Sequence, residues 1–430
     1  MLTDNILSRG AVMKKIIQNT LLGSDIQDIL IDGTKISGIG AGLVSSHPEA
    51  QIIDGKDTAA FPSLINGHTH SPMTLLRGAG DDLGLHEWLT ECMWPLEDKY
   101  TDEEFYWGNR MALMEMVRTG TGFFNEMYFN PHLALKALEE TPLKARINFP
   151  IMDGMNPEVG KKQWKDCERF FEETTAPQGV QLGMVLHSVY TDSRESIEWV
   201  RNFAADKNLP IHIHLSETEK EVQDCMEAHE GLSPVEYLHQ LGVLSQRVVA
   251  AHTVHLSETD IEILSDTGVN VVHNPGSNMK LASGVFPYKA LRDKKIPILL
   301  GTDGAASNNN LDMLEEMKLA ALLQKVHTGD PTLMSAEEIF EIATKKGAEI
   351  FNTGGGVIEL GKEADIILMD LKSPALFPAW NLISSMVYSA SGMDVKTHIS
   401  SGNVLMEDYK IPGYERVLEE AGRCFDRLRS

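Results

Sequence analysis

The sequence predicts an α/β protein: a (β/α)8 barrel of the TIM type with a small composite β-sandwich domain formed by both ends of the chain. Two observations carry this prediction. Between residues 61 and 355, short β-rich runs alternate with segments of helical pattern, which is typical of parallel strands joined by crossover helices. On either side of that region, β-rich runs return. We therefore expect three segments, 1–60, 61–355 and 356–430, with the first and last pairing into one domain.

The first segment reads as short strands at Lys15–Asn19, Asp28–Ile31 and Lys35–Ile39. Asp32-Gly33 lies between two of them, and this dipeptide favours a hairpin turn. Nothing in this unit suggests chemistry. Residues 1–12 lack a basic stretch followed by an apolar one, so we expect no secretory signal, and Met13 offers a second start.

The middle segment contains eight β-rich runs, and eight parallel strands with crossover helices close into a barrel. The expected strands are Phe61–His70, Gly122–Met127, Ala145–Asp153, Val180–His187, Pro210–Leu215, Val248–His252, Val269–His273 and Pro297–Asp303. Capping boxes open several of the intervening helices, at Thr101-x-x-Glu104, Ser233-x-x-Glu236 and Ser257-x-x-Asp260. A doubly wound open sheet is the alternative, but no Gly-x-Gly-x-x-Gly follows a first strand.

The last segment supplies β-rich runs at Glu363–Met369, Thr397–Ile399 and Val404–Met406, followed by a helical pattern over 413–428. These strands are expected to complete the N-terminal β unit.

Charge and cysteine usage exclude several kinds of partner. The formal net charge is -24, from 38 basic and 62 acidic residues, which argues against binding to nucleic acid or to an anionic membrane. No apolar run approaches the ~20 residues that a membrane span requires. Four cysteines without a Cys-x-x-Cys pair fit a reducing compartment. We expect a cytoplasmic homo-oligomer that acts on a small molecule.

The ends of the predicted strands are unusually polar, and in such barrels the C-terminal strand ends form the active site. They carry His68 and His70, then His187, His212 and His214, then His252, His273 and Asp303. His68 and His70 share one side of their strand, because residues i and i+2 point the same way. Two histidines from the first strand, one from the fifth and the aspartate of the eighth make a ligand set that suits Zn²⁺ or Fe²⁺.

The motifs around these residues resemble a known family. Pro62 to His70 is similar to the first-strand signature of the amidohydrolase superfamily, with Ser63 where that signature has glycine. More narrowly, four runs resemble the methylthioadenosine/S-adenosylhomocysteine deaminase family: His212 to Glu217, Ala251 to Leu256, His273 to Asn278 and Gly301 to Asn309. The resemblance extends over nearly the whole chain. It implies hydrolytic deamination of adenosine-type nucleosides, namely 5′-methylthioadenosine, 5′-deoxyadenosine, adenosine and S-adenosylhomocysteine.

The resemblance also implies roles for individual residues. The metal ligands would be His68, His70, His214 and Asp303, around one divalent ion, with Zn²⁺ expected first and Fe²⁺ second. The catalytic residues would be Glu217, His252 and Asp303, with Glu217 also contacting the substrate. Glu97 would bind the ribose hydroxyls and His187 the nucleoside. The fourth strand has no lysine at the position that bridges two metals in other members, so the site should be mononuclear.

Some interpretations stay open at this stage. For Glu217 the alternative is a carboxylate at a helix N-terminus, and the ligands beside it favour the catalytic role. For Glu97 a solvated loop carboxylate is almost as good an interpretation. His273 is interpreted as a residue that fixes a loop by hydrogen bonding to backbone. The segment 147–157 has no arginine to bind an amino-acid carboxylate; it offers Met152, Met155 and Pro157, with Lys161 and Lys162 beyond. This favours a small 5′ group on the substrate.

Two other functions are weighed against the deaminase. The first is another aminohydrolase or a chlorohydrolase that acts on a pyrimidine or triazine. The second, more remote, is a non-catalytic metal-binding scaffold, against which Glu217 argues because a scaffold needs no acid beside its ligands.

Overall fold

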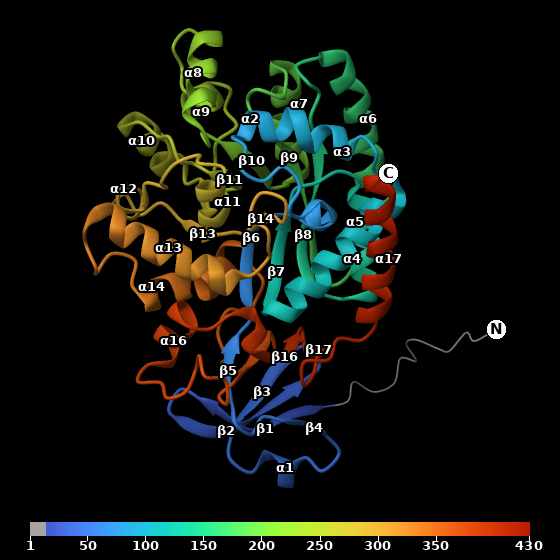
Figure 1. The fold of residues 1–430 in the computed structure, drawn as a ribbon, viewed down its shortest axis with the longest axis vertical. Helices are drawn as coiled ribbons and strands as arrows, with labels where there is room; N and C mark the ends of the chain where they lie inside the picture. Colours follow the sequence, from blue (N-terminus) through green and yellow to red (C-terminus); the bar gives the residue numbers. More distant parts are fainter. Residues whose placement is uncertain (1–13) are drawn as a thin grey trace, which may run out of the picture.

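The structure, a computed structural model, describes residues 14–430. Residues 1–13, with the second start expected at Met13, lie outside that range. A central barrel occupies the middle of the molecule, and a smaller β-sheet built from both ends of the chain lies beneath it (Figure 1).

Nine short parallel strands make the barrel in the described part of the chain. They are β6 (Leu64–His70), β7 (Thr121–Glu126), β8 (Lys144–Ile151), β9 (Val180–Leu186), β10 (Ile211–Leu215), β11 (Val248–His252), β12 (Asn270–His273), β13 (Ile298–Leu300) and β14 (Asp303–Gly304). At one end of the sheet order, β13 pairs with β12. At the other end, β14 pairs with β6. Because only two residues separate β13 from β14, the sheet closes on itself, which confirms the predicted fold class.

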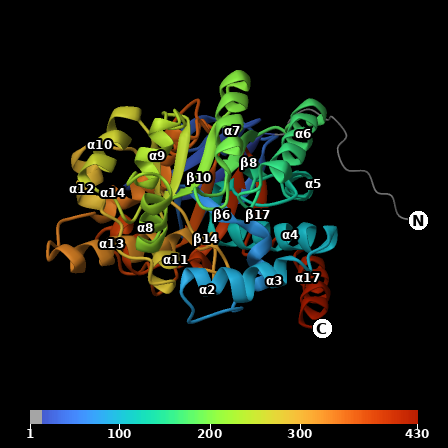
Figure 2. The same ribbon diagram turned by 90° about the horizontal axis from the view of Figure 1, so that it is seen from above.

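Helices surround the barrel on its outer side (Figure 2). They are α4 (Asp102–Thr119), α5 (Pro131–Glu140), α6 (Pro157–Glu173), α7 (Arg194–Lys207), α8 (Glu219–Ala228), α9 (Pro234–Gln240), α10 (Glu258–Thr267), α11 (Pro275–Lys280), α12 (Tyr288–Asp293), α13 (Met313–Thr328), α14 (Ala336–Glu341), η3 (Ile342–Lys346) and α15 (Gly347–Ile350). All three predicted capping boxes are present, at the starts of α4, α9 and α10.

Between β6 and α4 the chain forms short helical turns above the C-terminal ends of the strands (Figure 1). These are η1 (Ser71–Leu76), α2 (Leu85–Glu87), the π-helical turn η2 (Trp88–Met93) and α3 (Trp94–Glu97). The C-terminal helix α17 (Tyr414–Arg429) packs along α4 and contacts η1.

The two chain ends form one composite sheet, as the sequence predicts. Its strands are β1 (Lys15–Leu22), β2 (Asp25–Asp32), β3 (Lys35–Gly40), β4 (Gln51–Asp54), β5 (Thr58–Pro62), β15 (Ile366–Asp370), β16 (Val395–Ser400) and β17 (Asn403–Met406). The order is β17-β16-β15-β5-β1-β2-β3, with β4 on β1. The short helices α1 (Leu43–Ser46), α16 (Leu382–Tyr388) and η4 (Gly392–Asp394) lie in its connections. The domain boundaries at residues 60 and 355 stay predictions.

Two strands predicted as continuous are each interrupted. The prediction of one strand over Phe61–His70 is wrong at its start, because Phe61 and Pro62 pair with β15 of the composite sheet. The chain changes partners at Ser63, whose N–H donates to the carbonyl of Asp365, while Leu64 N–H donates to that of Gly120. The strand predicted over Pro297–Asp303 breaks after Leu300, where Thr302 is held by the side chain of Asn66.

The lower half of the barrel is filled with apolar side chains, including Ile65, Phe123, Val272, Leu299 and Phe351. Gly67 lies against this layer, and a Cβ there would approach Leu299 Cβ and the Leu300 carbonyl to 3.1 Å. Glycine therefore lets β6 come close to β13. None of the helices in residues 14–430 combines the length and apolar character that a bilayer crossing requires.

Candidate active site

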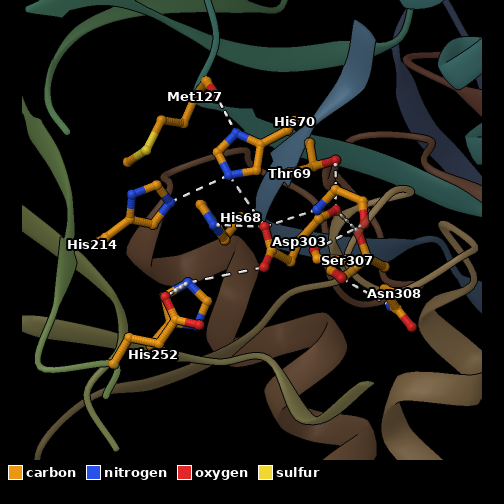
Figure 3. A network of polar contacts seen from close by, with 12 residues as sticks. His68, Thr69, His70, Met127, His214, His252, Asp303, Ser307 and Asn308 are labelled. Atoms are coloured by element: carbon orange, nitrogen blue, oxygen red, sulfur yellow. Dashed lines mark hydrogen bonds and ion pairs between the residues drawn. The ribbon is translucent and has the colours of Figure 1, made fainter. Parts of the chain in front are cut away.

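Four predicted ligands converge where β6, β10 and β14 end. His68 Nε2 lies 3.2 Å and His70 Nε2 3.1 Å from Asp303 Oδ1. His214 Nε2 lies 3.2 Å from His70 Nε2. The side chains point toward one centre (Figure 3). Parallel strands present their C-terminal ends at one edge, which is why residues far apart in sequence meet here.

The far side of each imidazole is held by a hydrogen bond. His70 Nδ1–H donates to the carbonyl of Met127 (Figure 3). His214 Nδ1–H donates to the carbonyl of His187 over 3.1 Å. A carbonyl oxygen can only accept, so both Nδ1 atoms carry the proton, and in a neutral ring Nε2 is then a bare lone pair. A hydrogen bond of this kind on the far nitrogen orients a metal-binding histidine.

This geometry fits a divalent metal ion. The Nε2 atoms of His70 and His214 lie 3.2 Å apart, close enough for one ion to bind both rings. His68 Nε2 is buried without a hydrogen-bond partner in the described residues. Burial lowers the pKa of His68 to about 4 and holds that of His214 well below its usual value, so these rings are neutral. Three imidazoles and a carboxylate are a donor set that Zn²⁺ prefers.

Asp303 is the anionic member of the group. Its backbone φ is 64°, a left-handed conformation that is rare for residues other than glycine. His252, at the end of β11, has a φ of 73°. Strained residues of this kind cluster at functional sites, where the surrounding structure enforces them.

Glu217 and His252 lie beside the ligands. His252 Nε2 is 3.6 Å from Glu217 Oε2 and 4.0 Å from Asp303 Oδ2. Ser283 Oγ donates to Glu217 Oε1 over 3.0 Å. Burial raises the pKa of Glu217 above its usual value, which suits a group that must hold a proton and release it.

Helix α8 fixes the loop that carries Glu217. The buried Glu221 carboxylate accepts from the backbone N–H of Ser216 at 2.8 Å and of Glu217 at 2.7 Å. On the neighbouring side, His252 Nδ1 lies 3.0 Å from Asn278 Oδ1. The first pair of contacts fixes the backbone at Glu217, and the second contact fixes the ring of His252. Glu217 and His252 therefore face the predicted ligands in a fixed arrangement.

A cavity opens above this group and is roofed by the turns between β6 and α4. Its apolar lining consists of Met73, Leu85, Trp88, Leu89, Trp94, Met127, Phe129, Pro150, Met152, Val185 and Leu281. Its polar lining includes Glu97, Tyr128 and His187, beside His70, His214, Glu217, His252 and Asp303. No lysine or arginine from residues 14–430 lines it.

Glu97 lies at the end of α3 and faces this cavity, so it is no solvated loop carboxylate. The Tyr128 hydroxyl donates to Glu97 Oε1. Burial raises the pKa of Glu97, and the bond from Tyr128 opposes that rise. His187 lies on the other side, with Nδ1 3.0 Å from Thr191 Oγ1 and its backbone N–H donating to Asp192.

Several residues near the site differ from their predicted roles. The interpretation of His273 is wrong: its ring nitrogens meet no partner in the described residues, and the ring stacks on Phe286 at 4.4 Å. Met152 lines the cavity, but Met155 and Pro157 do not. Lys161 is exposed and pairs with Glu158 outside the cavity.

Sequence reasoning missed Tyr128, Asn278 and Ser283. Tyr128 directly follows the strand predicted over Gly122–Met127, and Asn278 ends the run that begins at His273. Their roles follow only from their partners in space, Glu97 and His252. Nothing in the sequence marks Ser283.

Comparisons with known proteins agree with this geometry. Residues 59–405 match the amidohydrolase family. The chain is 42% identical over 419 residues to the 5′-deoxyadenosine deaminase of Methanoregula boonei, covering 96% of this chain and 95% of that one. It is 45% identical over 387 residues to the 5-methylthioadenosine/S-adenosylhomocysteine deaminase of Thermococcus sibiricus, covering 88% and 89%. Among solved structures, an adenosine deaminase of Xanthomonas campestris with bound zinc superposes with a TM-score of 0.90 at 29% identity, covering 97% of this chain and 99% of that one.

Proposed function

The chain belongs to the amidohydrolase family, and we propose that within it the protein is a metal-dependent deaminase that hydrolyses adenosine-type nucleosides to inosine analogues and ammonia. The observation that carries this proposal is the position of Glu217. A buried carboxyl with a raised pKa lies beside three imidazoles and a carboxylate, at the base of a largely apolar cavity.

The ligand set would hold one divalent ion, which we propose to be zinc, through His68, His70, His214 and Asp303. When bound, such an ion would act as a Lewis acid and lower the pKa of a water molecule to about 7.

The remaining chemistry falls to side chains. Deamination requires a proton on purine N1, a nucleophile at C6 and a proton for the departing ammonia. Glu217 donates to N1 from Oε2, because Oε1 is engaged by Ser283. Asp303 would take the first proton of the water through Oδ2, since Oδ1 faces His68 and His70, and pass it to the departing amino group. The second proton of the water, on the hydroxyl added at C6, would return to Glu217 as ammonia leaves. His252 Nε2 lies between the two carboxylates and orients the reacting groups.

The substrate's ribose is proposed to lie against Glu97. The hydrogen bond from Tyr128 fixes one carboxylate oxygen and favours the ionised form, which can accept from both ribose hydroxyls. His187, on the opposite wall, is proposed to contact the nucleoside. Its pKa is lowered by burial to about 3, so it is a neutral hydrogen-bonding group.

The 5′ end of the substrate is proposed to be small and uncharged. The wall near β8 and β9 consists of Pro150, Met152 and Val185, and Phe129 follows β7. A zwitterionic homocysteine tail would need charged partners in order to leave water, and no cationic side chain lines the cavity within residues 14–430. Hydrogen, methyl or methylthio groups suit such a surface.

Ammonia release tests this function directly. Zinc-loaded protein is incubated with adenosine, 5′-deoxyadenosine, methylthioadenosine and S-adenosylhomocysteine, and the fall in adenine absorbance is followed in parallel. Release from at least one nucleoside supports the deaminase. Release only from aminopyrimidines, or of halide from a chlorotriazine, would favour the alternative hydrolase, and zinc binding with no turnover of any of them would favour the scaffold.

A further inference from the structure

One buried histidine of the barrel has no place in the chemistry above. His212 lies on β10, two residues before His214, and is 1% exposed. It is not among the residues that line the cavity. Its ring nonetheless makes two short contacts: Nδ1 lies 2.8 Å from the carbonyl of Val249, and Nε2 lies 2.8 Å from His68 Nδ1.

These contacts fix both tautomers. The Val249 carbonyl can only accept, so the proton of His212 is on Nδ1. The ring has no carboxylate among these partners and is buried, so it is neutral and its Nε2 is a bare acceptor. His68 Nδ1 must then carry the proton that joins the two rings. His68 Nε2, the atom 3.2 Å from Asp303, is left with its lone pair.

His68 is thereby distinguished from the other two ligand histidines. His70 and His214 donate to backbone carbonyls, which every sequence provides. The partner of His68 is a side chain, and it reaches across the barrel, because three strands separate β6 from β10 in the sheet order. A mutation can therefore remove this acceptor without touching a ligand.

We propose that His212 is a positioning residue for the metal site. The Val249 carbonyl holds the proton of His212 on Nδ1, so that His212 Nε2 accepts from His68 Nδ1–H. This hydrogen bond fixes the His68 ring and keeps His68 Nε2 unprotonated. This inference rests on the proposed metal site. It assigns His212 no contact with the substrate.

The test measures zinc affinity by titrating zinc-loaded protein with a chromophoric chelator. His212→Phe keeps a ring but removes the acceptor, and we expect zinc binding to weaken about 10–100-fold, as removal of outer-shell partners typically does. His212→Gln can place an amide oxygen near the former Nε2 and should bind zinc within about threefold of wild type. His212→Asn is too short to reach His68 and should resemble His212→Phe.

His273→Phe is the matched control. His273 is equally buried at the end of β12, and its ring nitrogens make no hydrogen bond in the described residues. The same substitution there should leave zinc affinity unchanged. If His212→Phe fails to fold, judged by circular dichroism, the comparison of His212→Gln with His212→Asn carries the test.

Wild-type zinc affinity in His212→Phe or His212→Asn, or equal weakening in His212→Gln and His212→Asn, would overturn the positioning role. Two other results would contradict the proposed metal site itself, and with it this inference. They are wild-type protein that binds no zinc and His68→Ala that binds zinc normally.

Discussion

Ser283 Oγ donates a hydrogen bond of 3.0 Å to Glu217 Oε1, while Glu217 Oε2 faces His252 Nε2 at 3.6 Å. The two oxygens of this carboxyl are therefore not equivalent. One is engaged by a hydroxyl, and the other is left toward the cavity. A proton on Glu217 accordingly resides on the oxygen that faces the substrate position.

Replacing Glu217 with glutamine should retain the metal and remove most turnover. The amide keeps the shape of the side chain but cannot exchange a proton, and losses of about 10²–10⁴-fold in kcat are typical of a missing acid–base group. Zinc content and kcat are measured on the same preparation. Glu219→Gln, an exposed neighbour on α8, is the control. Near-normal kcat in Glu217→Gln would assign the acid elsewhere.

Purified protein should hold one divalent metal per chain. His68, His70, His214 and Asp303 form one compact group, and the described residues show no bridging lysine among the cavity lining. Metal analysis of protein purified without chelator, with activity followed as zinc is added back, gives the stoichiometry. Full activity that requires two ions per chain would contradict a mononuclear site.

The enzyme should discriminate against 2′-deoxy nucleosides. With one ribose hydroxyl absent, a partly buried Glu97 oxygen loses its partner, which costs about 1–3 kcal/mol, or roughly 5–150-fold in kcat/KM. Tyr128→Phe leaves Glu97 less firmly held. This variant should therefore show a smaller ratio of kcat/KM for ribonucleosides to kcat/KM for 2′-deoxy nucleosides. Glu91→Gln, exposed on the same segment, should leave it unchanged. Equal kcat/KM for ribo- and 2′-deoxy substrates in wild type would exclude Glu97 from ribose binding.

The 5′ substituent should decide the preferred substrate. We expect kcat/KM for 5′-deoxyadenosine or methylthioadenosine to exceed that for S-adenosylhomocysteine by about tenfold or more, which corresponds to about 1.4 kcal/mol. All substrates are assayed by ammonia release on one preparation. If S-adenosylhomocysteine is turned over equally well, a cation from outside the cavity lining must reach its carboxylate.

The stability of the fold should fall as pH rises toward 8. Burial raises the pKa of Glu316 from 4.5 to about 8, and its carboxyl lies against Gly276 N–H and Asn308. Between about pH 4.5 and pH 8, Glu316 keeps its proton in the folded protein but has lost it in the unfolded chain. This contribution to stability is thus complete below about pH 4.5 and is lost as pH rises through about 8.

Urea unfolding of wild type and Glu316→Gln at pH 6 and pH 8.5 measures this effect. The free energy of unfolding of Glu316→Gln should rise relative to that of wild type as pH rises, by at most about 1.4 kcal/mol per pH unit. Glu315 is an exposed neighbour, and the free energy of unfolding of Glu315→Gln should change with pH as that of wild type does. A parallel profile for Glu316→Gln as well would show that Glu316 does not titrate in this range.

The meeting of His68, His70, His214 and Asp303 could be predicted because these residues lie at the ends of parallel strands, and strand ends meet at one edge whatever the loops between them. Which histidine of β10 joins the group formed by His68, His70 and Asp303 could not be settled from residue types alone. His212 and His214 both point into the barrel, and only their depth places His212 against His68 and His214 against His70.

The features that the sequence did not predict depend on contacts between residues far apart in the chain. The break in the eighth strand depends on Asn66, which bonds to Thr302 over 2.7 Å across 236 positions of sequence. The orientation of Glu97 depends on Tyr128, on a different element. Local pattern holds no information on such pairs, so the sequence could place Glu97 in the right segment but not decide between solvent and cavity.

The strand β5 pairs with β15 and β1 in the composite sheet and ends at Pro62. Only Ser63 separates it from β6, which carries the proposed ligands His68 and His70. Ribosomal synthesis makes β5 early and β15 only about 300 residues later, and domains generally fold as units from the N-terminus. The first ligand strand is therefore anchored to a sheet that is completed last. We expect a nascent chain that stops before β15 to lack a formed site even though all four ligands have been synthesised, so that metal loading follows completion of the chain.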